Sequence, residues 1–183
     1  MSREDPIGPS DWVAAAIEAL AEVGEAGVAI EPLARRLSVT KGSFYHHFTD
    51  RDHLWTAVLQ AFEQDGTDAI VAMTGAIPDP RERLSSLFAA AFDRPEHLRA
   101  TRALLGSRRP DVAACLARVH DRRRAWLAQC YRELGSAPDV AEGQAATAYA
   151  LYLGVVQLAD QPPFAHADSL HRWVSGLGRF LLP

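Results

Sequence analysis

The amino-acid sequence predicts an all-α protein of about nine helices. Apolar residues recur every three or four positions through most of the 183-residue chain, which is the spacing of one face of a helix. No segment alternates apolar and polar residues for long enough to predict a strand. The 12 glycines and 11 prolines stand largely between the periodic stretches, where these residue types begin or end helices. The pattern therefore predicts helices joined by short breaks.

Four helices are predicted in the N-terminal part of the chain. Ser10 is suited to cap the first of them, and Thr49 or Asp50 the fourth, because short polar side chains accept hydrogen bonds from the free N–H groups at helix starts. Gly24 and residues 38–40 interrupt the apolar periodicity. The helices are therefore expected over residues 11–23, 30–37, 41–48 and from 50 to beyond 70.

Five further helices are predicted in the rest of the chain, over residues 81–92, 96–105, 111–134, 140–160 and 168–181. No apolar run reaches the roughly 18 residues of a membrane span, so no membrane partner is expected. The first residues are acidic, whereas a secretory signal starts with basic residues and continues with an unbroken apolar run. We therefore expect a cytoplasmic protein.

Cysteines and histidines do not predict a redox or metal site. Cys115 and Cys130 lie in one predicted helix and are separated by roughly 22 Å along it, too far for a disulfide. His46 and His47 project in different directions from their helix, and His53 lies beyond a break. No cysteine or carboxylate completes a set at ligand spacing, so we expect buried reduced thiols, no metal and no cofactor.

Charge is unevenly distributed along the chain. The net charge is −4, which by itself does not indicate a nucleic-acid partner. Residues 35–51 nevertheless carry four cations and one acid, whereas the first 34 residues carry seven acids and one arginine. A local basic patch on an acidic protein is a pattern that nucleic-acid-binding proteins use.

The two short helices around Thr40 fit a helix-turn-helix, a unit whose second helix enters the major groove of DNA. Ala34 is the small residue needed where the helices cross, and Val39 is the apolar residue of the turn. Phe44 and Phe48 anchor the second helix from its inner face. Donors and aromatic residues then occupy the outer side, as groove reading requires: Lys41, Ser43, Tyr45, His46 and His47.

Residues 30–54 resemble the DNA-binding signature of TetR-family transcriptional repressors. The core of the resemblance is Val39 to Phe48, which reads VTKGSFYHHF, and the matching stretch covers about residues 12–60. The resemblance implies an all-helical homodimer in which three N-terminal helices bind an operator. It also implies a C-terminal helical domain that binds a small molecule and thereby lowers DNA affinity.

The resemblance also assigns DNA contacts to particular residues. Lys41 and Ser43 are expected to reach base edges, with Lys41 favouring guanine through its N7 and O6 acceptors. Gly42 lets the backbone approach DNA closely. The remaining contacts are expected mainly on phosphates, with His46 able to contact either phosphates or bases: Tyr45, His46, His47 and Arg51.

Three positions depart from the family pattern. Ser38 stands where the turn usually has glycine, so it must adopt or avoid a left-handed backbone. Ala29 stands at the start of the second helix, where a hydroxyl residue would supply a cap or a phosphate contact. Glu31 places an acid where the family is often basic or neutral, and it is expected to repel DNA.

The C-terminal half gives broader indications of a ligand site. Its aromatic residues are more often core than pocket, but the resemblance implies an apolar cavity among them. The ligand-binding candidates are Phe62, Phe88, Phe92, Trp126, Tyr149 and Tyr152. Nine arginines also crowd residues 94–124 against three acids. We interpret most of them as a solvated face, with capture of an anion as the alternative and with Arg108 and Arg109 as the better candidates for coupling to the N-terminal part.

The last two predicted helices are more apolar than one small core needs. A two-fold interface made from both would give a four-helix bundle across a homodimer. Its candidate residues are Ala145, Ala148, Tyr152, Val156, Trp173, Leu177 and Phe180.

The sequence thus predicts a DNA-binding domain over residues 8–54 and a ligand-binding and dimerisation domain over residues 55–183. The expected function is a transcriptional regulator, in particular a repressor that a small molecule releases from an inverted-repeat operator. The alternative is a small helical enzyme or ligand-binding protein whose helix-turn-helix resemblance is accidental. No phosphate-binding loop, nucleophilic serine turn or paired acids in an apolar setting favours an enzyme.

Overall fold

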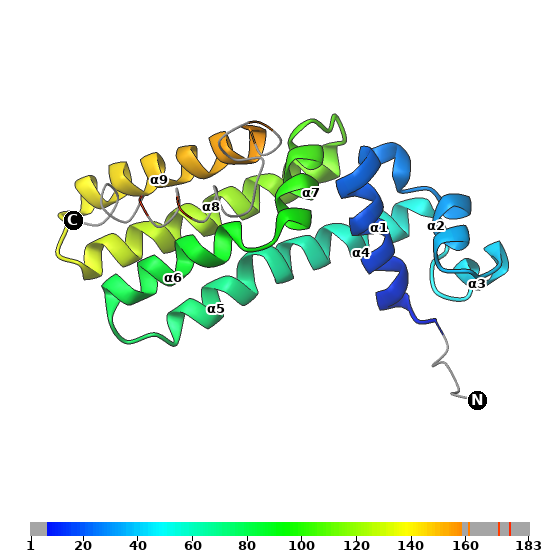
Figure 1. Ribbon diagram of the computed structural model, residues 1–183, viewed down its shortest axis with the longest axis horizontal. Helices are drawn as coiled ribbons and strands as arrows, with labels where there is room; N and C mark the ends of the chain where they lie inside the picture. Colours follow the sequence, from blue (N-terminus) through cyan, green and yellow to red (C-terminus); the bar gives the residue numbers. More distant parts are fainter. Residues whose placement is uncertain (1–6, 159–160, 162–171, 173–175, 177–183) are drawn as a thin grey trace.

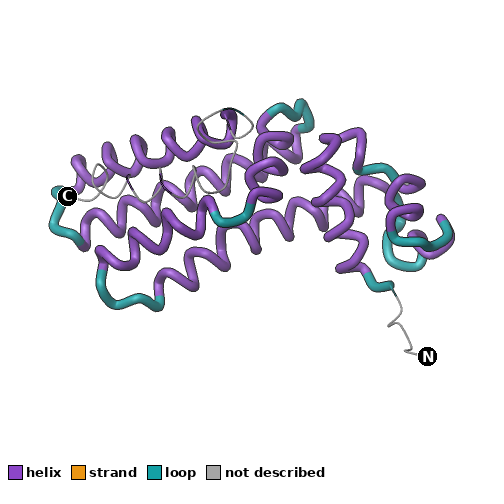
Figure 2. The backbone as a smooth tube through the Cα atoms, in the orientation of Figure 1, coloured by secondary structure: helices purple, strands orange, loops and turns teal. Residues whose placement is uncertain are grey.

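The computed structural model describes residues 7–158 together with residues 161, 172 and 176. This part of the chain is helical throughout and contains no strand, as the sequence predicts (Figures 1 and 2). Two short turns of other helix types interrupt the α-helices, namely the 3₁₀ turn η1 (Gly24–Gly27) and the π-helical turn η2 (Gln64–Asp68). The α-helices in these residues are α1 (Pro9–Val23), α2 (Ile30–Arg36), α3 (Lys41–Tyr45), α4 (Arg51–Glu63), α5 (Ala69–Gly75), α6 (Pro80–Phe92), α7 (Pro95–Leu105), α8 (Pro110–Glu133) and α9 (Pro138–Leu158).

The start of α1 differs from the prediction, because Gly8 and not Ser10 is the N-cap residue. The backbone N–H of Gly8 donates to the Asp11 carboxylate at 2.7 Å, which satisfies one donor that the helix leaves free. Pro9 occupies the first helical position, where its fixed φ suits the helix and its missing N–H costs nothing. At the fourth predicted helix the expectation of a cap is confirmed, because Asp50 Oδ1 accepts from the His53 N–H at 2.8 Å.

The long helix predicted from residue 50 is divided into α4, η2 and α5. It runs from the end of the molecule that holds α2 and α3 into the middle of the helical body (Figure 1). The number of helices among the described residues therefore matches the prediction only because this one is divided. The helix predicted over residues 168–181 lies outside the described residues apart from residues 172 and 176.

Two hydrophobic clusters form the core. The first joins α1, α2, α3 and the whole of α4 with residues of α7 and the first half of α8. The second joins α6, α7, the second half of α8 and α9. Leu54 and Trp55 are both fully buried in the first cluster, so the boundary predicted between residues 54 and 55 falls inside one hydrophobic cluster.

The two cysteines are free and buried, as predicted. Burial raises the pKa of the Cys130 thiol to about 11 and also raises the pKa of Cys115, so both remain protonated thiols. Within the described residues, no helix has the length and apolar character needed to cross a membrane.

Candidate nucleic-acid interface and internal cavity

The turn between α2 and α3 ends α2 with a left-handed residue. Ser38 has φ of +56° and is the only non-glycine residue with positive φ among those described. Its N–H donates to the Arg35 carbonyl at 3.2 Å, and the Val39 N–H donates to the Ala34 carbonyl at 2.9 Å. These two bonds form the motif that commonly terminates helices with glycine at the left-handed position, so Ser38 adopts the strained conformation and does not avoid it.

Aromatic packing fixes α3 against α1. Phe44 and Phe48 are buried and stack on each other with ring centroids 5.4 Å apart. Trp12 of α1 meets Phe44 edge-on at 5.2 Å. Ala34 is buried where α2 crosses α3, and Val39 packs against the first hydrophobic cluster. The structure therefore places all four predicted anchors of the helix-turn-helix on its inner side.

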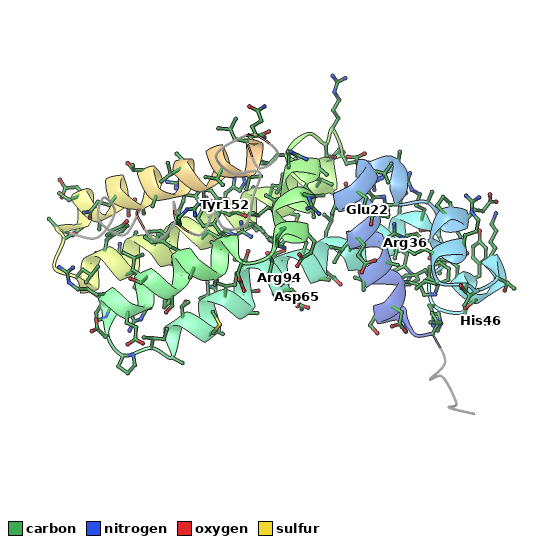
Figure 3. The ribbon with its side chains drawn as sticks, viewed as in Figure 1. Glu22, Arg36, His46, Asp65, Arg94 and Tyr152 are labelled. Carbon is green, nitrogen blue, oxygen red and sulfur yellow. The ribbon has the colours of Figure 1, made fainter. Side chains whose placement is uncertain are left out.

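The outer side of α3 exposes Lys41, Gly42, Tyr45 and His46, with Ser43 half-buried. Figure 3 shows His46 at the tip of the molecule, far along its axis from Tyr152. Nothing inside the protein requires glycine at residue 42, because a Cβ there would meet only Thr40 Oγ1, at 3.5 Å. A polar, exposed helix face with an unobstructed backbone is a surface suited to another molecule.

Glu31 contacts one of the predicted DNA-binding side chains directly. Lys41 Nζ lies 3.2 Å from Glu31 Oε1, with both side chains exposed. The sequence predicted only a general repulsion of DNA by Glu31. The structure adds that the Glu31 carboxylate occupies a donor of the Lys41 ammonium group. At this exposure such a pair contributes about 0–1 kcal/mol, which a DNA acceptor would readily replace.

Two predicted phosphate ligands bind the protein's own backbone instead. Arg51 Nε donates to the Val28 carbonyl at 2.6 Å, and its Nη2 donates to the Glu25 carbonyl at 3.1 Å. His47 Nε2 lies 3.0 Å from the Ile7 carbonyl. Carbonyls around η1 and before α1 accept from these donors, so the two side chains hold neighbouring segments in place. Only their remaining donors are free for phosphate.

The start of α2 lacks a side-chain cap, as the sequence predicts from Ala29. Within the described residues no group of three His, Cys, Asp or Glu side chains is arranged to hold a metal ion.

Arg109 joins the start of α8 to α4. Its guanidinium lies 5.1 Å from the centroid of the Trp55 ring and donates to Asp52 at 2.9 Å and to Asp111 at 2.8 Å. These contacts hold the pKa of Asp111 below its usual value, mainly through the hydrogen bond from Arg109. Arg108, the other predicted coupling residue, is exposed.

An apolar cavity of about 70 Å³ lies in the helical body between η2, α5, α6, α7, α8 and α9. Five of the six predicted ligand residues line it, namely Phe88, Phe92, Trp126, Tyr149 and Tyr152. Phe62 does not line it, which corrects the expectation that this side chain faces the cavity. The imidazole of His97 stacks on the Phe62 ring at 4.7 Å and forms the wall in its place.

Apart from the Tyr152 hydroxyl, the polar side of the cavity consists of residues that the sequence analysis did not select as ligand residues. Arg123 donates to Thr67 Oγ1 at 3.0 Å, to the Gly66 carbonyl at 2.9 Å and to the Tyr152 hydroxyl at 3.1 Å. His97 Nε2 lies 3.3 Å from Arg123 Nη2. The cluster of arginines over residues 94–124 was the available signal, but it did not reveal which arginine turns inward.

His97 is neutral in this setting. Burial, followed by the positive charges of Arg123 and Arg94, lowers its pKa to about 3. A neutral imidazole keeps one nitrogen free as an acceptor, which allows His97 to lie beside the Arg123 guanidinium.

The predicted dimer-interface residues of α9 face the interior of the subunit. Ala145, Ala148, Tyr152 and Val156 are all at least 92% buried and belong to the second cluster. They pack against α8 and other helices of the same chain, because an apolar face covers the nearest apolar surface. This corrects their assignment to a surface available to a second subunit. The other three predicted interface residues, Trp173, Leu177 and Phe180, lie outside the described residues.

Aromatic residues anchor the short helix α3, which exposes a polar face and is joined through α4 to a helical body with a cavity. These features define the class of helix-turn-helix regulators. The sequence model for bacterial regulatory proteins of the tetR family matches residues 13–58, from α1 into α4. Over residues 13–58 the chain therefore has the sequence of the TetR family of bacterial regulatory proteins.

Individual proteins resemble the chain to different extents. The HTH-type transcriptional regulator BetI 2 of Chromohalobacter salexigens is 30% identical over 94 residues, which are 50% of this chain and 45% of that protein. BetI of Brucella anthropi is 25% identical over 175 residues, covering 91% and 90% of the two chains. The chain thus spans about half the length of the first curated relatives that it matches. The regulatory protein TetR from Rhodobacter sphaeroides shares the fold, with a TM-score of 0.76, 23% identity and coverage of 95% and 98%.

Proposed function

We propose that the protein is a DNA-binding transcriptional regulator, and specifically a repressor that a small molecule releases from its operator. The observation that carries the proposal is the outer side of α3, where exposed donors surround Gly42 and nothing in the protein itself requires a glycine. DNA would lie against this face, with Lys41 and Ser43 at base edges in the major groove. A bacterial transcriptional regulator of this kind would act in the cytoplasm, where the DNA lies.

The DNA contact can be tested directly on one side chain. Lys41 is the only lysine in the sequence, so amine-specific acetylation modifies this residue and the chain's α-amino group alone. Operator duplexes selected from a random pool should protect Lys41, and the selected sites should be inverted repeats. Lys41→Ala should weaken operator binding by about 1–3 kcal/mol and relax preference at one symmetric base pair. Selection that returns no preferred sequence would exclude a sequence-specific regulator.

Release by a small molecule rests on the position of the cavity. Its wall includes Gly66 and Thr67 of η2. η2 directly continues α4, and α4 begins just after the helix-turn-helix formed by α2 and α3. A ligand that favours one arrangement of this segment shifts the population between DNA-binding and released states. Linkage requires operator DNA to weaken ligand binding by the same factor, typically about 5–150-fold. Calorimetry with and without saturating operator measures that factor.

A homodimer is the assembly that an inverted-repeat operator requires. With the inner face of α9 buried in its own subunit, we assign the contact to the opposite face, where small residues are exposed and permit close helix approach: Gly143, Ala146, Ala150 and Gly154. Ala150→Glu should then give monomers in sedimentation, whereas Glu82→Gln in α6 should leave the assembly unchanged. A dimer that survives Ala150→Glu would move the interface elsewhere.

A further inference from the structure

Among the described residues, Arg123 has no carboxylate partner, and it lies at the wall of an apolar cavity. Its three hydrogen-bond acceptors are a hydroxyl of Thr67, a backbone carbonyl of Gly66 and a hydroxyl of Tyr152. All of them are neutral, as is the adjoining imidazole of His97. The guanidinium also lies over the Tyr152 ring, 5.3 Å from its centroid. Neutral acceptors satisfy the donors of the group but leave its positive charge uncompensated.

Neighbouring arginines of the same helix have the carboxylate partners that Arg123 lacks. Arg118 is paired with Glu63 at 2.8 Å and Arg122 with Asp68 at 3.4 Å. At the cavity wall, Arg94 pairs with Glu96 at 3.3 Å. Within the described part of the chain, Arg123 has no such ion pair. Arg123 is the arginine of α8 that both lines the cavity and contacts η2, and the described residues supply no carboxylate to pair with it.

The rest of the cavity wall is apolar and aromatic, with side chains such as Leu87, Phe88 and Leu127. An apolar body would be buried there at a gain of about 25 cal/mol per Å². A planar guanidinium binds a carboxylate through two parallel hydrogen bonds, a geometry that a hydroxyl or an amine does not match.

We propose that the cavity binds an organic anion with an apolar body, namely an aliphatic or aromatic carboxylate whose head group pairs with Arg123. The proposal names the ligand class of the proposed regulator. It rests on that proposed function only for the ligand's effect on operator binding. Three of the five N–H donors of Arg123 now bind neutral acceptors, two of which are in η2. A carboxylate competes for these donors, so its binding weakens the hydrogen bonds between α8 and η2. Because η2 directly continues α4, this change also affects α4.

The experiment compares head groups on one apolar chain. Butanoate, hexanoate, octanoate and decanoate are titrated into the full chain by calorimetry, each beside the alcohol and the amine of equal length. The carboxylate of the best length should bind at least about tenfold more tightly than its alcohol, since a charge-assisted bond contributes about 1.5–3 kcal/mol. The amine should bind more weakly than the alcohol, because its charge repels Arg123. Equal affinity of acid and alcohol, or no binding by any of the acids, would overturn the proposal.

Variants then locate the preference. Arg123→Gln should abolish the advantage of the acid over the alcohol, and Arg123→Lys should retain part of it, because lysine keeps the charge but not the planar fork. Arg122→Gln is the matched control, since its partner Asp68 is not part of the cavity wall. Retention of the full preference in Arg123→Gln would assign the carboxylate to another residue.

Operator binding is measured separately, so that two failures can be told apart. If octanoate binds through Arg123 but operator affinity is unchanged, the ligand class stands and ligand-controlled release fails for this ligand. If the protein binds an operator but shows no preference for acids, the proposed regulator stands and the inference about the ligand is wrong.

Discussion

The imidazole of His97 occupies the space that a side chain at Gly66 would need. A Cβ on residue 66 would overlap the Cε1 and Nε2 atoms of the ring. Gly66 lies in the π-helical turn η2, and its carbonyl accepts from Arg123 at 2.9 Å. π-Helical turns within α-helices occur frequently at functional sites. Here the turn brings together a glycine, a neutral histidine and an unpaired cation at the cavity wall.

Gly66→Ala should destabilise the protein by about 1–3 kcal/mol, the usual effect of overpacking. Helical Gly→Ala changes are otherwise stabilising by about 0.5–1 kcal/mol. Gly42→Ala in α3 is the control, since a Cβ there meets only Thr40 Oγ1, at an ordinary contact distance of 3.5 Å, and it should stabilise the protein. Urea unfolding measures both. A Gly66→Ala protein as stable as the original would mean that His97 moves without cost.

Ser38→Gly should stabilise the protein by about 1 kcal/mol. The change removes the cost of a left-handed backbone at φ +56°, which is about 1–3 kcal/mol for a residue with a side chain, and part of that gain is lost to the flexibility of unfolded glycine. Ser38→Ala retains the strain and should give no gain. Thermal unfolding of the two variants side by side checks the difference, and equal melting temperatures would contradict it.

Stability should fall with acid through His97. The pKa of its imidazole is lowered from 6.5 to about 3 in the folded protein, so the unfolded chain binds a proton that the folded chain does not. Stabilisation is therefore complete above about pH 6.5 and declines as the pH falls toward about 3, by up to roughly 1.4 kcal/mol per pH unit. The decline should be shallower in His97→Gln and unchanged in His46→Gln. If the free energy of unfolding depends on pH in the same way in the original protein and in His97→Gln, the prediction is wrong.

Glu31→Gln should strengthen operator binding. The change frees Lys41 from the contact at 3.2 Å and removes a negative charge that faces DNA. Affinity measured across a salt series should rise, with a slope steeper by up to about one unit. Glu142→Gln removes an exposed acid from α9, far along the chain from α3, and should have little effect. An affinity unchanged by Glu31→Gln would show that the acid does not compete for Lys41.

Arg109→Gln should lower the free energy of unfolding by about 1–2 kcal/mol, since it removes a cation from the Trp55 ring and from two carboxylates. Arg108→Gln, at the exposed neighbouring position, should be nearly neutral. Denaturant unfolding compares the two. Equal effects would mean that the Arg109 contacts contribute nothing beyond an ordinary surface charge.

The helix-turn-helix could be predicted from the sequence because its determinants are local. Ala34, Val39, Phe44 and Phe48 lie within 15 residues of one another, and their spacing alone places them on one side of two short helices. The side chains left outside follow from the same spacing. The family resemblance pointed to Ser38 as the turn position that must adopt or avoid a left-handed backbone, and the structure shows that it adopts one.

Contacts between helices far apart in the sequence determine which groups the side chains of α9 and the arginines meet. Periodicity shows that α9 has an apolar face, but it does not show that α8 of the same subunit covers Ala148 and Val156. Composition shows many arginines, yet which of them turns inward depends on the rotation of α8 against η2. The carbonyls that bind Arg51 lie 23 and 26 residues earlier in the chain. A sequence pattern fixes which way a side chain points from its own helix, whereas the group it meets there depends on how distant helices pack.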